Sequence, residues 1–201
     1  MGGARPGPDF VHLHVASSAS MRYGASHPAD LVARAAELDQ PALALTDRDG
    51  LYGAVRFVRA CRDAGIAPVL GVDLALGESV LSGTGEADTP FITGVRHTTT
   101  RTPVKGGVLV DDQQPRVVVL ARGQRPGLGP GVGWGRLCRL VTQTHLARER
   151  SVPRTSPALL ARAAAPVDGL APVVVLLGPD SDVGRAVLAR RRGLARQLLQ
   201  A

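Results

Sequence analysis

Two histidines stand two residues apart in the segment 10–15 (FVHLHV), a spacing that suits a metal site. The segment alternates apolar and polar residues, as a β-strand with one solvated face does, so His12 and His14 are expected on one face together with Phe10. The other face would point into the core through Val11, Leu13 and Val15. Two imidazoles on the same side of a strand can bind one cation, and zinc, manganese and iron accept both imidazole and carboxylate ligands.

Carboxylates follow two later strands that the sequence predicts. Asp47 and Asp49 flank Arg48 directly after the apolar run 42–46 (ALALT), and Asp73 lies near the end of 67–76 (APVLGVDLAL). Because the carboxyl ends of parallel strands meet at one edge of an α/β sheet or barrel, these side chains are expected near the histidines. The same residues also allow a simpler interpretation, in which the histidines are ordinary polar residues at a strand end.

The elements that must position these residues alternate along the first 76 residues. Helical apolar spacing predicts helices over 26–40, where Ser26 is a candidate N-cap, and over 51–65, where Gly65 is a candidate end. With the three strands at 10–15, 42–46 and 67–76, the order is strand–helix–strand–helix–strand. This order predicts parallel strands with right-handed crossovers.

The remainder of the chain continues the alternation after an interruption. We expect a flexible Gly/Pro-rich leader at 1–9 and a domain over 10–201, with a flexible insertion at about 77–115, where periodicity is weak. Further strands are predicted at 116–121 and 172–178, for five or six in all. Further helices are predicted at 132–150, 156–164 and 180–200.

Composition narrows the class of protein. The chain has 201 residues, 44% of them apolar, and a net charge of +7, with 23 arginines and one lysine among its cationic residues. Neither cysteine, Cys61 or Cys138, forms a CxxC pair, which argues against a cysteine zinc site. No run resembles a signal peptide or a membrane span, so we expect a cytoplasmic protein without a membrane partner.

Several motifs together resemble one known family. Four parts of the chain are similar to the PHP (polymerase and histidinol phosphatase) domain of bacterial C-family DNA polymerases. In chain order they are HLHVASSAS, ALALTDRDGLYGAVRF, RVVVLARG with WGRLCRLVTQTHLA, and PVVVLLG. The likeness is greatest to the error-prone form of the DNA polymerase III alpha subunit. It implies an α/β fold, a distorted seven-stranded β/α (TIM-like) barrel that this chain need not complete, and an ancestral multi-metal phosphoesterase site.

The resemblance also assigns ligand positions, and several are altered in this chain. His12 and His14 match two histidine ligands, and Asp73 stands in place of a metal-bridging glutamate. The family's other acidic, histidine and Gly-Cys positions fall on residues of different chemistry: Tyr23, Arg48, Arg116 and Gly178-Pro179. The implied residual metal site is therefore His12, His14 and Asp73, lined by Asp47, Arg48, Asp49 and Arg116. It would hold no metal, or one weakly bound zinc or manganese ion.

The two histidines allow two interpretations, and Arg48 and Arg116 allow three. The histidines form either a residual one-metal site or a relic pair bonded to Asp47, Asp73 or water. Arg48 and Arg116 either replace lost cations by pairing with nearby carboxylates, bind phosphate, or lie on the surface.

The resemblance implies a function in DNA replication and damage-tolerant repair synthesis. We expect a scaffold with a degraded metal site, partnered by a polymerase core or other replication and repair proteins, and contacting DNA through the parent polymerase. The family's polymerase carboxylates lie far downstream, so the chain alone is expected not to extend DNA. The alternative is a stand-alone metal-dependent phosphoesterase or 3′–5′ exonuclease. Truncated gene product, split subunit and independent protein all remain open.

Overall fold

The computed structural model describes residues 10–77, 114–146 and 153–200, which form a mixed α/β fold. One sheet holds four strands in the order β1-β2-β3-β4. The strands are β1 (Ala42–Arg48), β2 (Ala67–Ala75), β3 (Arg116–Ala121) and β4 (Val173–Leu176). The helices are α1 (Pro28–Glu37), α2 (Ala54–Ala64), α3 (Val132–Leu146), α4 (Pro157–Ala164), α5 (Asp182–Leu188) and α6 (Arg192–Gln200). The predicted leader, 1–9, and most of the predicted insertion, 78–113, lie outside the described residues.

Strand directions confirm part of the predicted topology. β1 and β2 are parallel and α2 lies between them in the chain, which confirms the predicted strand–helix–strand unit. β3 is antiparallel to both β2 and β4, unlike the all-parallel order of a β/α barrel. Two helices, α3 and α4, lie between β3 and β4 in the chain. The seven-stranded barrel therefore stays a prediction, since the described residues form a sheet of four strands.

The first predicted strand, 10–15, is wrong as a strand but right in its position. The segment runs beside β1, and two of its carbonyls accept backbone hydrogen bonds, His12 O from Ala44 N (2.9 Å) and Val15 O from Thr46 N (2.8 Å). The amide of Val15 bonds the Thr46 hydroxyl instead of a backbone carbonyl, so a regular ladder does not form. Leu13, predicted to be in the core, is 41% exposed.

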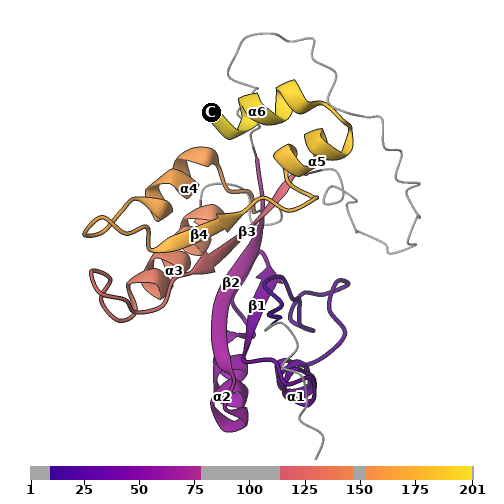
Figure 1. Cartoon of the computed structure of the whole chain (residues 1–201), viewed down its shortest axis with the longest axis vertical. Helices are drawn as coiled ribbons and strands as arrows, with labels where there is room; N and C mark the ends of the chain where they lie inside the picture. The colour runs from indigo at the N-terminus through magenta and orange to yellow at the C-terminus, as the bar shows by residue number, and fades with distance from the viewer. Residues whose placement is uncertain (1–9, 78–113, 147–152, 201) are drawn as a thin grey trace, which may run out of the picture.

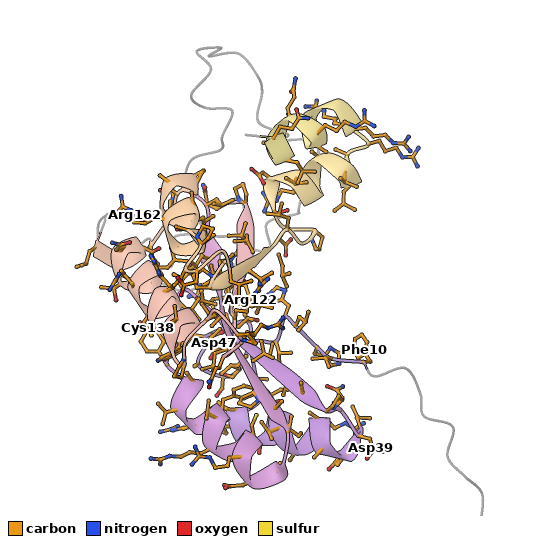
Figure 2. The ribbon with its side chains drawn as sticks, turned by 60° about the vertical axis from the view of Figure 1, so that its left-hand side comes forward. Phe10, Asp39, Asp47, Arg122, Cys138 and Arg162 are labelled. Carbon is orange, nitrogen blue, oxygen red and sulfur yellow. The ribbon has the colours of Figure 1, made fainter. Side chains whose placement is uncertain are left out.

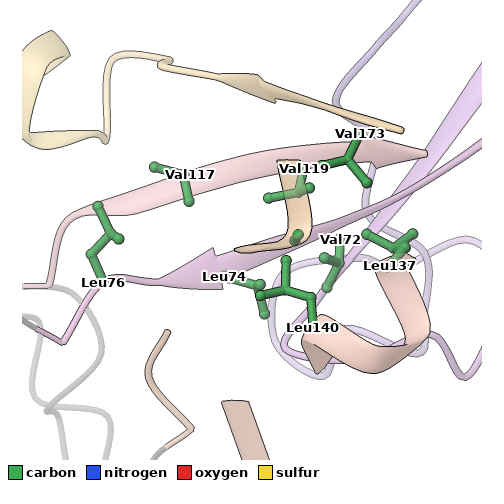
Figure 3. Close-up of a cluster of buried hydrophobic side chains, with 9 residues drawn as sticks. Val72, Leu74, Leu76, Val117, Val119, Leu137, Leu140 and Val173 are labelled. Carbon is green, nitrogen blue, oxygen red and sulfur yellow. The ribbon is translucent and has the colours of Figure 1, made fainter. Parts of the chain in front are cut away.

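Alternation along the strands divides the sheet into two unlike faces. On one face, Val72, Leu74, Val117 and Val119 pack against Leu137 and Leu140 of α3, as Figure 3 shows. The same face of β1 packs Leu43 and Leu45 against Phe57 and Cys61 of α2 and Val32 of α1. The opposite face carries a much smaller apolar cluster of Ala44, Val118 and Leu120. The helix-covered face thus holds most of the core, and the opposite face is less apolar.

Local sequence explains where the helices begin and end. α4 starts after Ser156, whose hydroxyl accepts a hydrogen bond from Leu159 N, as an N-cap serine does. α2 ends at Gly65 in the left-handed conformation (φ 71°), which confirms that predicted end. α1 begins one residue later than predicted, because His27 rather than Ser26 is its N-cap.

The predicted terminal helix, 180–200, is wrong as a single element. The helix is interrupted between α5 and α6, where Arg190 adopts a left-handed backbone (φ 59°). The break folds α6 back onto α5, so that a small separate core forms from Val183, Ala186, Ala195 and Leu198. In Figure 1 the two helices lie beyond the end of the sheet, away from α1 and α2. Among the described helices, none is long and apolar enough to span a bilayer.

Two glycines on α3 test how this helix docks onto the sheet. A Cβ at Gly133 would lie 2.2 Å from the Arg122 carbonyl oxygen and 2.7 Å from the Pro172 carbonyl oxygen, whereas one at Gly135 would meet no atom within 4 Å. Gly133→Ala should therefore lower the free energy of unfolding by roughly 1–3 kcal/mol. Gly135→Ala should raise it by about 0.4–1 kcal/mol, because alanine restricts the unfolded chain and suits a helix. Urea unfolding monitored by circular dichroism measures both; equal effects at the two positions would contradict the docking.

Candidate functional site

The face of the sheet without helices brings Asp73 and Arg116 together. Asp73 lies between Val72 and Leu74, whose side chains enter the core, so its own side chain points to the opposite face. In the β2–β3 register Asp73 pairs with Val118 and Ala75 pairs with Arg116. Asp73 and Arg116 are therefore diagonal neighbours across an antiparallel pair, within reach of a long side chain.

The Arg116 guanidinium binds two carboxylates in a buried position. Its Nε lies 2.9 Å from Asp73 Oδ1, and one terminal nitrogen lies 3.0 Å from Asp49 Oδ1. That same nitrogen also donates to the Asp73 carbonyl oxygen at 2.9 Å. The side chains of Arg116 and Asp73 are only 6% and 8% exposed. Opposite charges that are paired and hydrogen-bonded in this way can be tolerated inside a protein, whereas a single one cannot.

His14 approaches the same carboxylate from the segment that borders β1. Its Nε2 lies 3.7 Å from Asp73 Oδ2, and its side chain is half exposed. His14, Asp73 and Arg116 line a cavity of about 30 Å³, which is completed by Val118, Gly178, Pro179 and Asp180. Gly178-Pro179, assigned by resemblance to a ligand position, thus reaches the cavity. A space of this size holds a water molecule or two, but no nucleotide.

Asp73 stays ionised because its neighbours outweigh its burial. Burial by itself raises the pKa of Asp73, but His14 and the charge and hydrogen bond of Arg116, with a smaller effect of Arg48, bring that pKa below its ordinary value of 3.8. The site therefore keeps its carboxylate ionised through His14 and Arg116 together.

Two predicted site residues have other partners. The Arg48 guanidinium stacks on the Tyr23 ring, with its central carbon 3.5 Å from the ring centroid. Both residues fall on ligand positions of the resemblance, and here they form a cation–π contact with each other. His12 makes an edge-on contact with the Phe10 ring, at 4.7 Å between centroids. His12 and Phe10 are both exposed.

Asp47, a third predicted site residue, points to the opposite face of the sheet from Asp73. Its side chain is on the same side as Leu43 and Leu45, since residues two apart in a strand share a face. There it accepts hydrogen bonds from the Ser17 amide (2.7 Å), the Ser17 hydroxyl (2.9 Å) and the Ser20 hydroxyl (2.7 Å). Asp47 therefore holds the segment that precedes α1 and does not join the cavity.

Ser17, Ser20 and His145 were not assigned these contacts from the sequence. The two serines are 0% and 2% exposed, and the only signal for them is their spacing in SSAS before an acidic strand end. His145, near the end of α3, makes a hydrogen bond through Nε2 with the Asp49 carbonyl oxygen. Asp49 itself has a left-handed backbone (φ 53°), and its amide bonds the Asp73 carbonyl oxygen at 2.8 Å. The contact links α3 to the loop whose carboxylate binds Arg116.

The side chains around the cavity do not fit a multi-metal centre. Across the described parts of the chain, no group of three or more His, Cys, Asp or Glu side chains is placed to bind an ion. Of the three predicted ligands, His14 and Asp73 are brought together, whereas His12 contacts Phe10. Arg116 occupies one oxygen of Asp73 and has only donors to offer.

The lowered pKa of Asp73 gives a signed pH dependence of stability. A carboxylate with a folded pKa below its unfolded value contributes stability above the unfolded pKa, and this is lost as pH falls through the folded pKa. Asp73→Asn should lower the free energy of unfolding by roughly 3–5 kcal/mol at pH 7, because it leaves Arg116 short of a buried partner. The gap between wild type and variant should begin to narrow below about pH 4, where Asp73 of the unfolded chain takes up a proton, and it should narrow further until folded Asp73 is also protonated at lower pH.

Urea unfolding from pH 7 to pH 2.5 measures this gap. Asp63→Asn, at an exposed position of α2, is the matched control and should show almost no gap at any pH. A gap for Asp73→Asn that stays constant down to pH 2.5 would show that the charge of Asp73 does not stabilise the fold.

Two relatives that match this chain are both error-prone DNA polymerases. The error-prone DNA polymerase of Mycolicibacterium paratuberculosis is 37% identical over 152 residues, covering 75% of this chain and 11% of that protein. The error-prone DNA polymerase of Symbiobacterium thermophilum is 34% identical over 186 residues, covering 92% of this chain and 13% of that protein. This chain thus spans only about a tenth of the length of these relatives.

A solved structure gives a looser likeness. An amidohydrolase from Chromobacterium violaceum, with bound sulfate and no metal, matches at 18% identity and a TM-score of 0.34 over 94% of this chain and 53% of that one. A TM-score this low carries no argument about the site. The family model of the PHP domain, in contrast, matches residues 12–201, and the chain belongs to the PHP domain family.

Proposed function

We propose that this chain is the PHP domain of an error-prone C-family DNA polymerase alpha-type subunit, in which Arg116 has taken the place of catalytic metal ions. In this proposal the domain is a cytoplasmic scaffold for a polymerase core, and it is not a phosphoesterase. The single observation that carries the proposal is the buried Arg116 guanidinium between Asp73 and Asp49.

The charge of Arg116 supports the loss of metal binding. A divalent ion bound to Asp73 and His14 would lie close to the guanidinium, which already bonds one Asp73 oxygen at 2.9 Å. At about 4 Å the repulsion is roughly 4 kcal/mol for each unit of charge on the ion, at the effective dielectric constant of a partly exposed site. Two ligands that are only partly available do not offset a cost of this size, because metal affinity depends on several deprotonated ligands.

The same ion pairs support a structural role. Arg116 on β3 bonds Asp73 on β2 and Asp49 in the loop after β1, and His145 joins that loop to α3. One buried cation therefore connects three successive parts of the sheet and a helix, as a structural metal would. The relatives are error-prone DNA polymerases many times longer than this chain, which supports a polymerase core as the partner and DNA as the substrate of the whole assembly.

Metal content and metal affinity test the proposal. Purified wild-type protein should carry less than one equivalent of zinc or manganese by elemental analysis. Arg48→His with Arg116→His should raise the affinity for Zn²⁺ in a calorimetric titration, since it removes two positive charges and adds two imidazole ligands. Arg139→His with Arg196→His adds the same imidazoles at exposed positions of α3 and α6 and should leave the affinity unchanged.

A functional site with metals would give the opposite results. Wild-type protein would then carry two or three equivalents of metal and would release nucleotides from a DNA 3′ end in a Mn²⁺-dependent reaction. These results together would show that the chain is a phosphoesterase and that the scaffold proposal is wrong. Unchanged Zn²⁺ affinity in a folded Arg48→His, Arg116→His variant would mean that these positions are not the former ligand positions.

A further inference from the structure

Positive charge is concentrated in one part of the molecule. Residues 10–77 hold six arginines against seven carboxylates, whereas the described residues from 114 to 200 hold twelve arginines against three carboxylates. A general preference for arginine over lysine does not explain this asymmetry. From 114 to 179, Asp168 is the single carboxylate among the described residues, which include seven arginines.

Three of these arginines gather where α3 packs beside α4. Arg136 and Arg139 lie three residues apart on α3, which places them on adjacent turns of one helix face. One terminal nitrogen of Arg136 donates to the Arg162 carbonyl oxygen at 3.3 Å, so the side chain of Arg136 reaches the last turn of α4. Arg139 and Arg162 are exposed. We call Arg136, Arg139 and Arg162 the α3–α4 basic face.

This face is separate from the Arg116 site. α3 and α4 cover the side of the sheet that carries Val72 and Val119, whereas Arg116 points to the other side. Figure 2 shows Arg162 on α4 and Cys138 on α3 along one side of the molecule, with Phe10 on the other. The basic face is therefore distinct from the Arg116 site, and an inference about it does not depend on the function proposed above.

The surroundings of the arginines identify the class of ligand. Protein interfaces centre on buried aromatic or large aliphatic side chains. Among the described residues 114–145 and 153–176, which include this face, no large hydrophobic side chain is exposed. The next residue, Leu146, is exposed and lies on the same side of α3 as Arg139, two turns away at the end of the helix. The other arginine-rich region, α5–α6, differs, since it exposes large aliphatic side chains beside its arginines. A positively charged surface without an apolar centre suits a ligand that carries regularly spaced negative charges. Arginine guanidinium groups also match the geometry of phosphate oxygens.

We propose that the α3–α4 basic face binds the phosphate backbone of duplex DNA without reading its sequence. Each arginine contacts phosphates and displaces condensed counterions, so binding depends steeply on salt. The arginines lie on two packed helices, which keeps them at fixed positions along a strand of phosphates.

Fluorescence anisotropy with the full chain and a labelled 20-base-pair duplex tests the proposal. Arg136→Gln, Arg139→Gln and Arg162→Gln combined should weaken binding by roughly tenfold or more at low salt. The slope of log affinity against log salt should become shallower by about 3, near one for each phosphate that the variant no longer binds. The corresponding Arg→Lys triple variant keeps the charges and should retain most of the slope, which separates a charge effect from misfolding.

The matched control removes three charges elsewhere. Arg190→Gln, Arg192→Gln and Arg196→Gln change the net charge by the same amount on α6 and its approach, and they should leave affinity and slope within about twofold of wild type. Equal losses of affinity in the two triple variants would show that net charge alone attracts DNA, and the proposal would be wrong.

Three further outcomes also contradict it. Poly-glutamate that competes as well as unlabelled duplex would indicate that the face binds acidic protein segments. An unchanged salt slope in the folded α3–α4 variant would mean that these arginines do not bind phosphate. Much tighter binding to one fixed duplex than to random duplexes, compared at equal salt, would contradict recognition of the backbone alone.

Discussion

One buried guanidinium organises the open face of this sheet. Arg116 is held by ion pairs with both Asp73 and Asp49. A charge with 6% exposure would be costly to bury alone, but with two carboxylates and a carbonyl oxygen as acceptors it is satisfied. His14 and the Arg116 pair also keep Asp73 ionised in spite of its burial. An arginine therefore compensates the charge of the carboxylates gathered here.

The residues that the resemblance assigns to ligand positions have partners within one region of the fold. Arg116 pairs with Asp73, and Arg48 stacks on Tyr23. His14 stays close to Asp73, whereas His12 contacts Phe10. Meanwhile Asp47 stabilises the approach to α1 through Ser17 and Ser20, on the other side of the sheet. The residues at these strand ends thus contribute to the folding of the domain.

Sequence reasoning predicted the local elements better than the arrangement of side chains. Helical spacing and buried apolar runs identified α2, β1, β2 and β3, because burial and capping act within a few residues. The strand at 10–15 was wrong because alternation alone does not show whether a regular ladder of hydrogen bonds forms, and the Thr46 side chain bonds one of its amides. Placing Asp47 beside Asp73 was wrong because the β1–β2 register pairs Asp47 with Val72, so that Asp47 shares the face opposite to Asp73. The diagonal contact of Arg116 with Asp73 needs the antiparallel register, which lies beyond local sequence.

The central claim is that a guanidinium fills the position of the metal ions. The most direct measurement is a crystal structure of the protein grown in millimolar Mn²⁺, with anomalous data collected to detect the ion. The account predicts Arg116 Nε within hydrogen-bond distance of Asp73 Oδ1 and no anomalous peak between Asp73 and His14. Anomalous peaks coordinated by His12, His14 and Asp73, with Arg116 turned away from both carboxylates, would contradict it.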